Sequence, residues 1–198
     1  MKFITGADTS HWEKNFDFVK AVRDGLVFMM TKATEGLGQD YTCAMLLEHA
    51  RLAGMKFRGI YHFFHAHISV TAQAAEYMKV YNATRPEMPP ILDLEETSVN
   101  GHADANVKEL ALMWLQAVEL QSGRVPMLYI DMNMINRLGI VQDARFKKYP
   151  LWVARYSKNQ PPLHWEFWQF TDKGEQSADT DYFAGTIDDL TKFCGITA

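Results

Sequence analysis

The stretch Phe57-Arg58-Gly59-Ile60-Tyr61-His62-Phe63-Phe64 is short and mostly apolar. A helical pattern follows it at Thr71–Thr84, and a second apolar run follows at Pro90–Leu94. Each run is about as long as a strand that is buried on both faces of a sheet. A strand, a helix and another strand in this order form the unit from which parallel sheets are built. This unit therefore indicates an α/β fold.

The same alternation extends in both directions along the chain. Helical patterns cover Tyr41–Ala53 and Ala103–Gln121, and Gly54, Gly123 and Gly139 stand where helices are expected to end. The other apolar runs, each predicted to be a strand, are Lys2–Gly6, Leu26–Thr31, Val125–Ile130, Pro150–Ala154 and Glu166–Phe170.

Several large side chains are predicted to lie in the core. Phe28, Phe57 and Trp114 are interpreted as core residues. In the helix expected at 103–121, one face is predicted to be buried because its members recur at helical spacing. That face consists of Leu110, Met113, Trp114, Ala117, Val118 and Gln121.

The order of elements fits both an open doubly wound sheet and a closed barrel. After about residue 150 the predicted strands crowd together and leave little room for helices. A full eightfold barrel usually needs about 250 residues, so a barrel of 198 residues would be a reduced one. One domain spanning residues 1–198 is the expected organisation.

Composition excludes several classes of protein. Lys and Arg number 20 against 24 Asp and Glu, and the pI is near 6.0, which argues against a nucleic-acid partner. No apolar run approaches the ~20 residues of a membrane helix, so no membrane partner is expected. Cys43 and Cys194 form no metal-binding spacing and are predicted to be small buried groups.

Two acids close the predicted strand Pro90–Leu94. Asp93 and Glu95 are two positions apart, so both point to one face of an extended chain. Carboxyl groups held close together repel, and the pKa of one of them should rise. The alternative is that both acids cap helices or pair with Lys32 and Arg155.

Further acids and rings follow other predicted strands. In parallel α/β folds the chemistry gathers at the carboxyl ends of strands, and Asp8 and Asp181 stand at such positions. Carboxyl pairs beside aromatic rings suggest glycoside hydrolysis, whereas any single ring fits core packing equally well. The rings near strand ends are Trp12, Tyr61, Phe64, Tyr129, Trp152, Tyr156, Trp165 and Trp168.

Seven segments in register carry a resemblance to a known family. They are Gly6–Trp12, Thr31–Gly36, Gly59–Phe64, Pro90–Glu95, Pro150–Tyr156, Trp165–Phe170 and Thr180–Asp181. In these segments the sequence resembles the family 25 glycoside hydrolases, which are lysozymes of the Chalaropsis type (N-acetylmuramidases). The resemblance implies a flattened β/α barrel with fewer helices than the eightfold parent. It also implies cleavage, with retention, of the β-1,4 bond from N-acetylmuramic acid to N-acetylglucosamine in peptidoglycan, without cofactor or metal.

The resemblance also implies roles for single residues. Glu95 would be the general acid and then the base. Asp93 would assist the substrate N-acetyl group, which attacks in place of a protein nucleophile; direct attack by Asp93 is the alternative. Asp8 and Asp181 would complete the acidic floor, with Tyr61 near the reacting group.

Further residues are expected to contact the substrate. The groove candidates are Tyr129, Trp152, Gln169, Trp12 and Lys32.

The sequence departs from the family pattern at two places. Tyr182 and Phe183 follow Asp181 where the family often has an apolar residue and Asn, which makes Asp179 the rival of Asp181. Glu96, next to Glu95, is interpreted as a loop residue or cap.

Three alternative functions stay open at this point. A chitinase-like hydrolase would need a longer acidic run before Asp93, and Met88–Leu92 contains no acid. A non-catalytic sugar-binding barrel would keep the groove and lose turnover. A metal-dependent hydrolase would use Asp8, Asp93 and the pair His65 and His67, with His62 close by.

Glycan strands of peptidoglycan are the expected partner, and a monomer is expected. The first residues are too few and too polar for the apolar core of a secretory signal. We therefore expect the wall to be reached by phage-type lysis, by another route without a signal, or after a signal that precedes this sequence.

Overall fold

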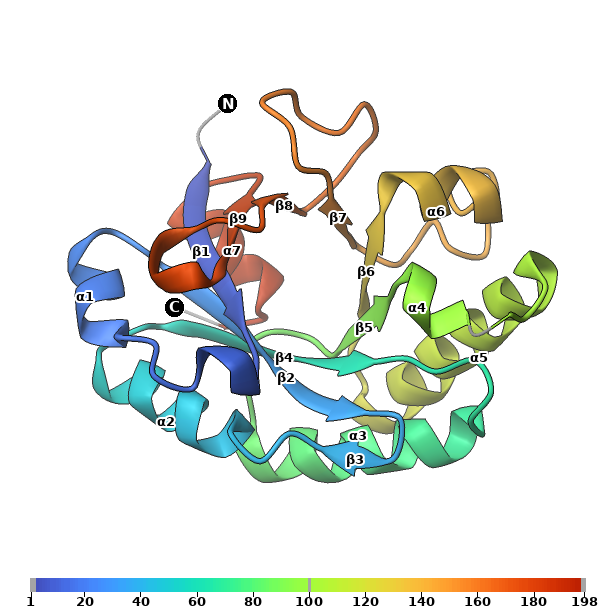
Figure 1. Ribbon diagram of the computed structural model, residues 1–198, viewed down its shortest axis with the longest axis horizontal. Helices are drawn as coiled ribbons and strands as arrows, with labels where there is room; N and C mark the ends of the chain where they lie inside the picture. Colours follow the sequence, from blue (N-terminus) through green and yellow to red (C-terminus); the bar gives the residue numbers. More distant parts are fainter. Residues whose placement is uncertain (1–2, 100, 197–198) are drawn as a thin grey trace.

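The fold is a closed barrel with helices on part of its outer surface (Figure 1). It was analysed in a computed structural model that describes residues 3–99 and 101–196. The sheet runs in the order β1-β9-β8-β7-β6-β5-β4-β2-β3, and an additional β1–β2 pairing closes the ring. Its strands are β1 (Ile4–Thr9), β2 (Phe28–Glu35), β3 (Gly38–Gln39), β4 (Phe57–Phe63), β5 (Ile91–Leu94), β6 (Met127–Asp131), β7 (Leu151–Ala154), β8 (Phe167–Thr171) and β9 (Asp179–Phe183).

One strand of the ring runs against the others. The pairings β1–β2, β2–β4 and onward to β7–β8 are parallel, whereas β9 is antiparallel to both β1 and β8. An antiparallel neighbour needs only a short connection, while a parallel one needs a crossover of a dozen or more residues. The antiparallel β9 therefore lets a short chain close the barrel.

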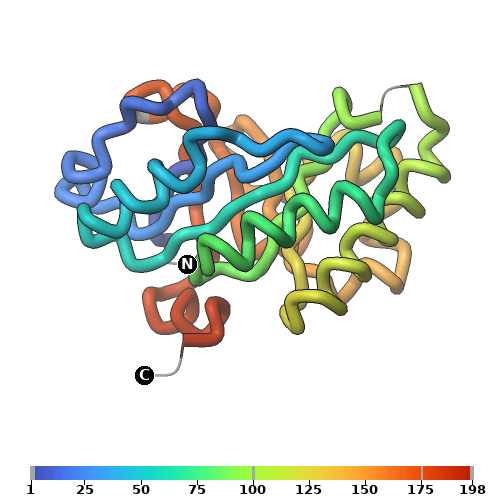
Figure 2. Tube along the Cα trace, turned by 90° about the horizontal axis from the view of Figure 1, so that it is seen from below, coloured from blue at the N-terminus to red at the C-terminus, as the bar shows by residue number. Residues whose placement is uncertain are grey.

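Helices cover the side of the barrel formed by β2, β4 and β5 (Figures 1 and 2). Helix α3 packs against both α5 and β2, and α2 packs against β2 and β4. None of the described helices is long and apolar enough to cross a lipid bilayer. The helices are η1 (His11–Glu13), α1 (Phe18–Arg23), α2 (Cys43–Leu52), α3 (Val70–Thr84), α4 (Glu96–Val99), α5 (Asp104–Ser122), α6 (Met132–Leu138), η2 (Glu175–Ser177) and α7 (Ile187–Phe193).

Aromatic side chains pack on one another along the outer side of β8 and β9. The ring of Tyr182 stacks on Phe170, with centroids 4.1 Å apart, and on Phe3, with centroids 5.3 Å apart. Trp168 packs against both Phe170 and Tyr182. These rings exclude water from a wall where the chain supplies little helix.

The amino-terminal end of the barrel is filled by apolar side chains and closed by α7 (Figure 2). Phe28 meets Phe167 edge to face at 5.2 Å, and Phe193 of α7 packs against Phe167 at 5.5 Å. Arg124 ties the segment after α7 to the barrel, because its guanidinium donates to the carbonyls of Cys194 at 2.8 Å and Met88 at 2.9 Å. The opposite end of the barrel is left for the site.

The structure confirms the predicted reduced barrel and extends several of its elements. Asp8 lies within β1 rather than after it, and β2 continues to Glu35. Gly123 and Gly139 end helices in the left-handed conformation, as expected. The sequence analysis gave no bounds for eight elements that the structure contains, namely β3, β9, η1, η2, α1, α4, α6 and α7.

The predicted buried face of α5 was partly wrong. Met113 is 50% exposed and Gln121 is exposed, whereas Val107 and Leu115 are buried. Trp114, Phe28 and Phe57 are buried as predicted. The true face is rotated toward Val107 and Leu115 because α5 packs on both α3 and the sheet.

A substitution at Gly6 tests the packing at the base of the barrel. In Gly6→Ala the added methyl group would overlap the ring of Phe28, which cannot retreat because Phe167 backs it. Overpacking of this kind costs about 1–3 kcal/mol, so we expect urea denaturation to show that loss. Gly38→Ala is the control, since its nearest neighbour is an ordinary contact at 3.5 Å. Equal stability of the two variants would contradict this account of the base.

Candidate active site

Three aspartates face the barrel interior from two neighbouring strands. Asp8 of β1 lies opposite Asp179 of β9, and Asp181 lies opposite Gly6. Residues two apart on a strand share a face, so Asp179 and Asp181 point the same way as Asp8. Since β9 runs antiparallel, it begins at the carboxyl ends of the other strands; Asp179 is therefore half-buried at the mouth and Asp181 is buried below it.

Gln169 of β8 holds this cluster together with all four hydrogen-bonding positions of its side-chain amide. Its Nε2 donates to Asp8 Oδ2 at 2.7 Å and to Asp179 Oδ2 at 3.0 Å. Its Oε1 accepts from the hydroxyl groups of Tyr129 at 2.8 Å and Tyr156 at 3.0 Å. The amide thus links the acids of β1 and β9 to the rings on the β6 and β7 side.

Burial and mutual repulsion make the aspartates weak acids. Burial raises the pKa of Asp181 to about 8, although the indole Nε1 of Trp152 donates to its Oδ1 at 2.7 Å. Burial, with the charges of Asp181 and Asp179, raises the pKa of Asp8 well above its usual value. Burial, with the charge of Glu13, raises the pKa of Asp179 to about 6. At neutral pH the cluster therefore retains protons that exposed carboxyl groups would have released.

The pair that ends β5 combines a buried and a half-buried acid. Asp93 is buried, and its Oδ1 has no hydrogen-bond partner. Burial and the charge of Glu95 raise its pKa well above the usual value. Burial and the charge of Asp131 raise the pKa of Glu95 as well. Repulsion thus raises the proton affinity of both groups, as the sequence predicted for at least one of them.

Glu95 opens onto a cleft of about 450 Å³. The turn into α4 fixes its backbone, because Ser98 Oγ accepts from the Glu95 N–H at 3.0 Å. Glu96, interpreted from the sequence as a loop residue or cap, is the first residue of α4, where it pairs with Arg137 and borders the same cleft. The cleft is lined on its other side by Tyr129 and the half-exposed Tyr156.

Neither of the two expected cations pairs with Asp93 or Glu95 in the part of the chain that the structure describes. Lys32 Nζ donates to Glu35 Oε2 at 2.9 Å, and Arg155 donates to the carbonyl of Gln160 at 2.7 Å. The positive charge of Lys32 lowers the pKa values of Asp93 and Glu95. The negative charge of Glu35 raises both values. The cation acts across space rather than by direct pairing.

Glu35 lines the mouth beside Lys32, and the sequence analysis did not identify it. It lies three positions after Lys32, and residues three apart on a regular strand face opposite ways. A bulge at Ala33 shifts the register, so that Lys32 pairs with Tyr61 and Glu35 with Phe63. Tyr61 and Phe63 share a face, so Lys32 and Glu35 do too. Bulges next to active sites commonly re-aim side chains in this way, and none can be recognised in the sequence.

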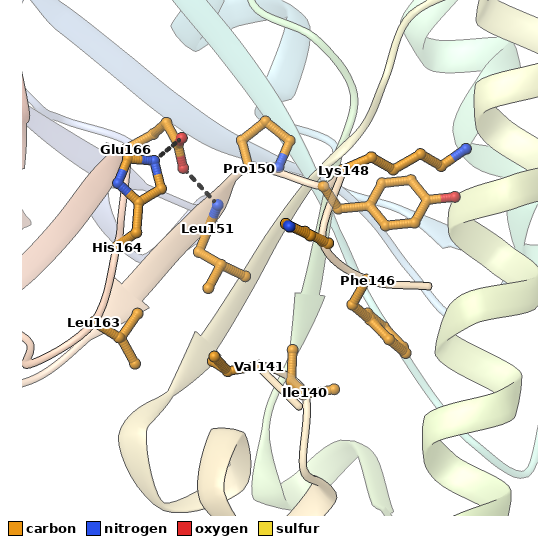
Figure 3. Close-up of a pocket in the computed structure, with 11 residues that line it drawn as sticks. Ile140, Val141, Phe146, Lys148, Pro150, Leu151, Leu163, His164 and Glu166 are labelled. Carbon is orange, nitrogen blue, oxygen red and sulfur yellow. Dashed lines mark hydrogen bonds and ion pairs between the residues drawn. The ribbon is translucent and has the colours of Figure 1, made fainter. Parts of the chain in front are cut away.

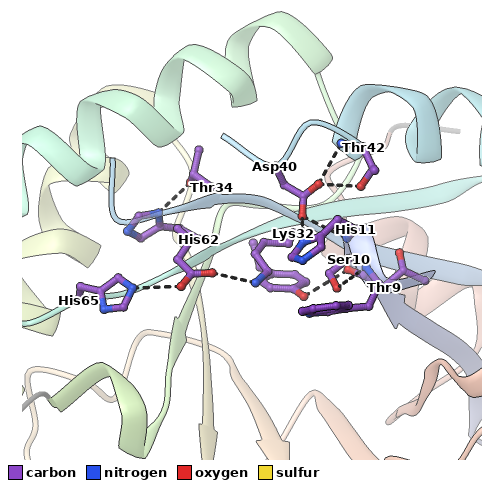
Figure 4. A network of polar contacts seen from close by, with 12 residues as sticks. Thr9, Ser10, His11, Lys32, Thr34, Asp40, Thr42, His62 and His65 are labelled. Carbon is purple, nitrogen blue, oxygen red and sulfur yellow. Dashed lines mark hydrogen bonds and ion pairs between the residues drawn. The ribbon is translucent and has the colours of Figure 1, made fainter. Parts of the chain in front are cut away.

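The histidines do not gather around a metal position. His62 is buried on the outer side of the barrel, where Thr34 Oγ1 lies 2.7 Å from Nδ1 and Gln73 Oε1 lies 3.1 Å from Nε2. Burial lowers its pKa to about 4. His65 Nε2 lies 3.2 Å from Glu35 Oε1 (Figure 4). Among residues 3–99 and 101–196 no group of three His, Cys, Asp or Glu side chains is arranged to hold a metal ion.

The predicted groove residues lie at different depths. Tyr61 and Tyr129 are buried among the acids, and the Tyr61 hydroxyl donates to the carbonyl of Thr9 at 3.2 Å. Trp152 is buried beneath them and supports Asp181, so a contact between its ring and a sugar stays a prediction. Trp12 is 78% exposed at the rim.

A separate hollow of about 320 Å³ lies at the amino-terminal side of β7 (Figure 3). Its lining is largely apolar and includes Ile140, Phe146 and Leu163. The acid of this hollow, Glu166, accepts from the Leu151 N–H at 2.9 Å and faces His164 at 2.9 Å. It contains none of the clustered carboxyl groups, so the chemistry belongs to the opposite end of the barrel.

The sequence model of glycosyl hydrolases family 25 matches residues 7–179. That span contains Asp8, Asp93, Glu95 and Gln169. The chain belongs to family 25 of the glycosyl hydrolases. This membership confirms the resemblance and the assignment of the chain as a glycoside hydrolase.

Relatives of this family 25 chain cover nearly its whole length. It is 31% identical to "Uncharacterized protein YegX" of Escherichia coli K12, over 96% of this chain and 73% of the relative. It is 29% identical to an N,O-diacetylmuramidase of Arthroderma benhamiae, over 96% of this chain and 86% of the relative. The solved structure of a muramidase from Trichobolus zukalii superposes with a TM-score of 0.89 at 28% identity, covering 98% of this chain and all of that one.

The buried acids predict an unusual dependence of stability on pH. The pKa of Asp181, about 8, exceeds that of an unfolded aspartate, so the native state binds more protons between about pH 4 and pH 8. The free energy of unfolding should therefore fall as pH rises through this window. In Asp181→Asn the hydrogen bond from Trp152 is kept and the titration is lost.

We expect urea unfolding to show that the free energy of unfolding decreases less between pH 5 and pH 8 for Asp181→Asn than for the wild type. The difference should reach at least about 1 kcal/mol, the equivalent of one pKa unit. Asp189→Asn serves as the control, because that exposed carboxyl group has a lowered pKa. Equal slopes for the wild type and Asp181→Asn would show that Asp181 is ionised in the native state.

Proposed function

We propose that this family 25 hydrolase cleaves the β-1,4 bond between N-acetylmuramic acid and N-acetylglucosamine in peptidoglycan, with retention of configuration. The observation that carries the proposal is the pair at the end of β5. Asp93 is buried and incompletely hydrogen-bonded, while Glu95 next to it opens onto the cleft. The relatives named as muramidases support the choice of bond.

Glu95 is the proposed general acid and base. Its raised pKa favours the protonated carboxyl group, which can protonate the leaving oxygen as the glycosidic bond breaks. In the second step a water molecule attacks the anomeric carbon and gives its proton to the Glu95 carboxylate, while the bond between that carbon and the acetamido oxygen breaks and the N-acetyl group is restored. Its backbone bond to Ser98 fixes where this proton is delivered.

Asp93 is proposed to assist the N-acetyl group of the substrate. The acetamido oxygen would attack the anomeric carbon, and the acetamido N–H would donate to the Asp93 oxygen that lacks a partner. A buried polar atom without a partner is rare in native structures, and this contact would supply one. The alternative, direct attack by Asp93, requires that this carboxylate form a covalent bond to the sugar.

Asp8 and Asp181 are proposed to set the electrostatics of the floor, with Asp179 as the acid nearer the mouth. Tyr61 and Tyr129 border Asp93, since its charge acts on the hydroxyl groups of both. Gln169 fixes these groups in place through Asp8 and Tyr129. Lys32 is proposed to line the substrate side of the mouth.

We further propose that residues 1–198 act as one catalytic domain and as a monomer. The substrate is proposed to be the glycan strand of the bacterial wall. A non-catalytic sugar-binding barrel is the second candidate. It is disfavoured because Glu95 and its neighbours keep the raised pKa values that proton transfer needs.

Replacement of Glu95 tests the proposal. In Glu95→Gln the amide cannot deliver a proton, so turnover of purified peptidoglycan should fall by at least about 10²–10⁴-fold. Asp93→Asn should lower turnover of peptidoglycan by a similar factor. Glu109→Gln is the matched control, because this exposed glutamate pairs with Arg145 on the surface of α5, away from the cleft.

The products identify the bond and the stereochemistry. Mass spectrometry of the wild-type digest should find reducing ends on muramic acid, and NMR of the first product should find the β anomer. Full activity of Glu95→Gln would overturn its role, ends on glucosamine would overturn the bond, and an initial α anomer would overturn retention.

The Lys32–Glu35 pair is expected to set the pH dependence of the reaction. Removing the positive charge in Lys32→Met should raise the pKa of Asp93 and Glu95, whereas Glu35→Gln should lower it. The alkaline limb of the pH profile of kcat/KM should then move to higher pH in Lys32→Met and to lower pH in Glu35→Gln. Each shift should be about half a pH unit, or about 0.7 kcal/mol.

The matched controls carry the same changes on the surface of α3. Lys79 and Glu76 form an ion pair with the same spacing, so Lys79→Met and Glu76→Gln alter the same charges away from the site. Their pH profiles should coincide with the wild type. Coincident profiles for the Lys32 and Glu35 variants as well would show that the pair has no influence on the acids.

A further inference from the structure

A ladder of aromatic rings stands at the rim of the barrel beside β1 and β2. We call it the rim ladder, and it consists of Trp12, His11 and Tyr41. The ring centroids are 4.5 Å apart for His11 and Trp12 and 6.2 Å apart for His11 and Tyr41. Trp12 is 78% exposed and Tyr41 is 76% exposed. Apolar rings gathered in this way on a surface commonly mark a binding site.

The rim ladder is held rigidly by a buried carboxylate (Figure 4). The Asp40 side chain is only 2% exposed. It accepts from the His11 N–H at 3.1 Å and lies 3.0 Å from His11 Nδ1. It also accepts from Thr42 N at 2.9 Å and Thr42 Oγ1 at 2.6 Å. The segment before Trp12 is thereby tied to the segment that carries Tyr41.

A local cap fixes η1 as well. Ser10 Oγ accepts from the Trp12 N–H at 3.3 Å, and Glu13 Oε2 accepts from the Ser10 N–H at 2.9 Å. Rings whose backbone is already fixed lose less conformational freedom when a ligand binds. Six polar contacts thus maintain two exposed rings in one arrangement, although burial of those rings contributes little to folding.

A cleft of about 400 Å³ lies beside the rim ladder. His11 and Tyr41, but not Trp12, belong to its lining, together with Gln39 and the Lys32–Glu35 pair. The charges of that pair act across space on Asp93 and Glu95. The cleft beside Glu95 and Tyr156 lies across the mouth, over β5, β6 and β7. The two clefts therefore flank the proposed catalytic pair on opposite sides.

We propose that the rim ladder binds a pyranose unit of the glycan strand at a distance from the bond that is cleaved. This inference rests on the proposed function and adds to it a site for longer chains. The C–H face of a sugar would lie on Trp12 and Tyr41, and polar groups of the cleft would meet its hydroxyl groups. The enzyme would then prefer long strands to short ones through binding rather than chemistry.

The test measures binding to peptide-free oligosaccharides in the Glu95→Gln background, where turnover is expected to be strongly reduced. The probes are a disaccharide and an octasaccharide of alternating N-acetylglucosamine and N-acetylmuramic acid, measured by calorimetry. Trp12→Ala and Tyr41→Ala should each weaken binding of the octasaccharide by roughly three- to tenfold. Binding of the disaccharide should not change, and Tyr41→Phe should keep the affinity because it keeps the ring.

Leu120→Ala is the matched control, since Leu120 is 87% exposed on α5 and should leave both affinities unchanged. The proposal is overturned if Trp12→Ala and Tyr41→Ala bind the octasaccharide as the background does. It is also overturned if they weaken both probes equally, which would indicate general damage. The activity of the wild type on peptidoglycan separates the two proposals. An inactive wild type would overturn the proposed function. An active wild type, together with Trp12→Ala and Tyr41→Ala variants that bind the octasaccharide as the background does, would overturn only the distal site.

Discussion

The side-chain amide of Gln169 is the interaction on which the rest of the site depends. It donates to Asp8 and Asp179 and accepts from Tyr129 and Tyr156. Carboxyl groups on facing strands repel each other, and a buried donor between them offsets part of that repulsion. With both N–H groups and both lone pairs used, the amide has a single orientation. The positions of four functional groups are thereby fixed by one side chain.

The direction of β9 gives the acidic cluster its depth. In a fully parallel barrel every strand presents its carboxyl end at the mouth. Strand β9 presents its amino end there, so Asp179 lies above Asp181 and both reach the interior beside Asp8. The deeper acid meets Trp152, and the upper one meets Gln169. In an all-parallel barrel of the same size, a crossover connection would be needed before the last strand, and this part of the chain would form that connection.

The family resemblance, and not the local pattern, predicted a reduced barrel rather than an open sheet. The pattern of residues itself was sufficient to predict the alternation of elements and the carboxyl pair of β5. These depend on local pattern, since short apolar runs and helical spacing are properties of adjacent residues. Glu35 escaped prediction because its orientation depends on the bulge at Ala33. The buried face of α5 was misjudged at Met113 because contact with α3 selects which residues are covered. Strand β9, with charged residues at alternate positions, lacks the apolar run that marks a buried strand.

Strand β9 closes the barrel between two segments that are synthesised at different times. Strand β9 sits between β1, from the beginning of the sequence, and β8, near its end. Asp8 can therefore meet Asp179 and Asp181 only after the residues of β9 have left the ribosome. Until then the nascent barrel is open along one edge, and a translation product that stops before β9 lacks the assembled acidic cluster. Closure of the ring and assembly of this cluster thus coincide in one late step of synthesis.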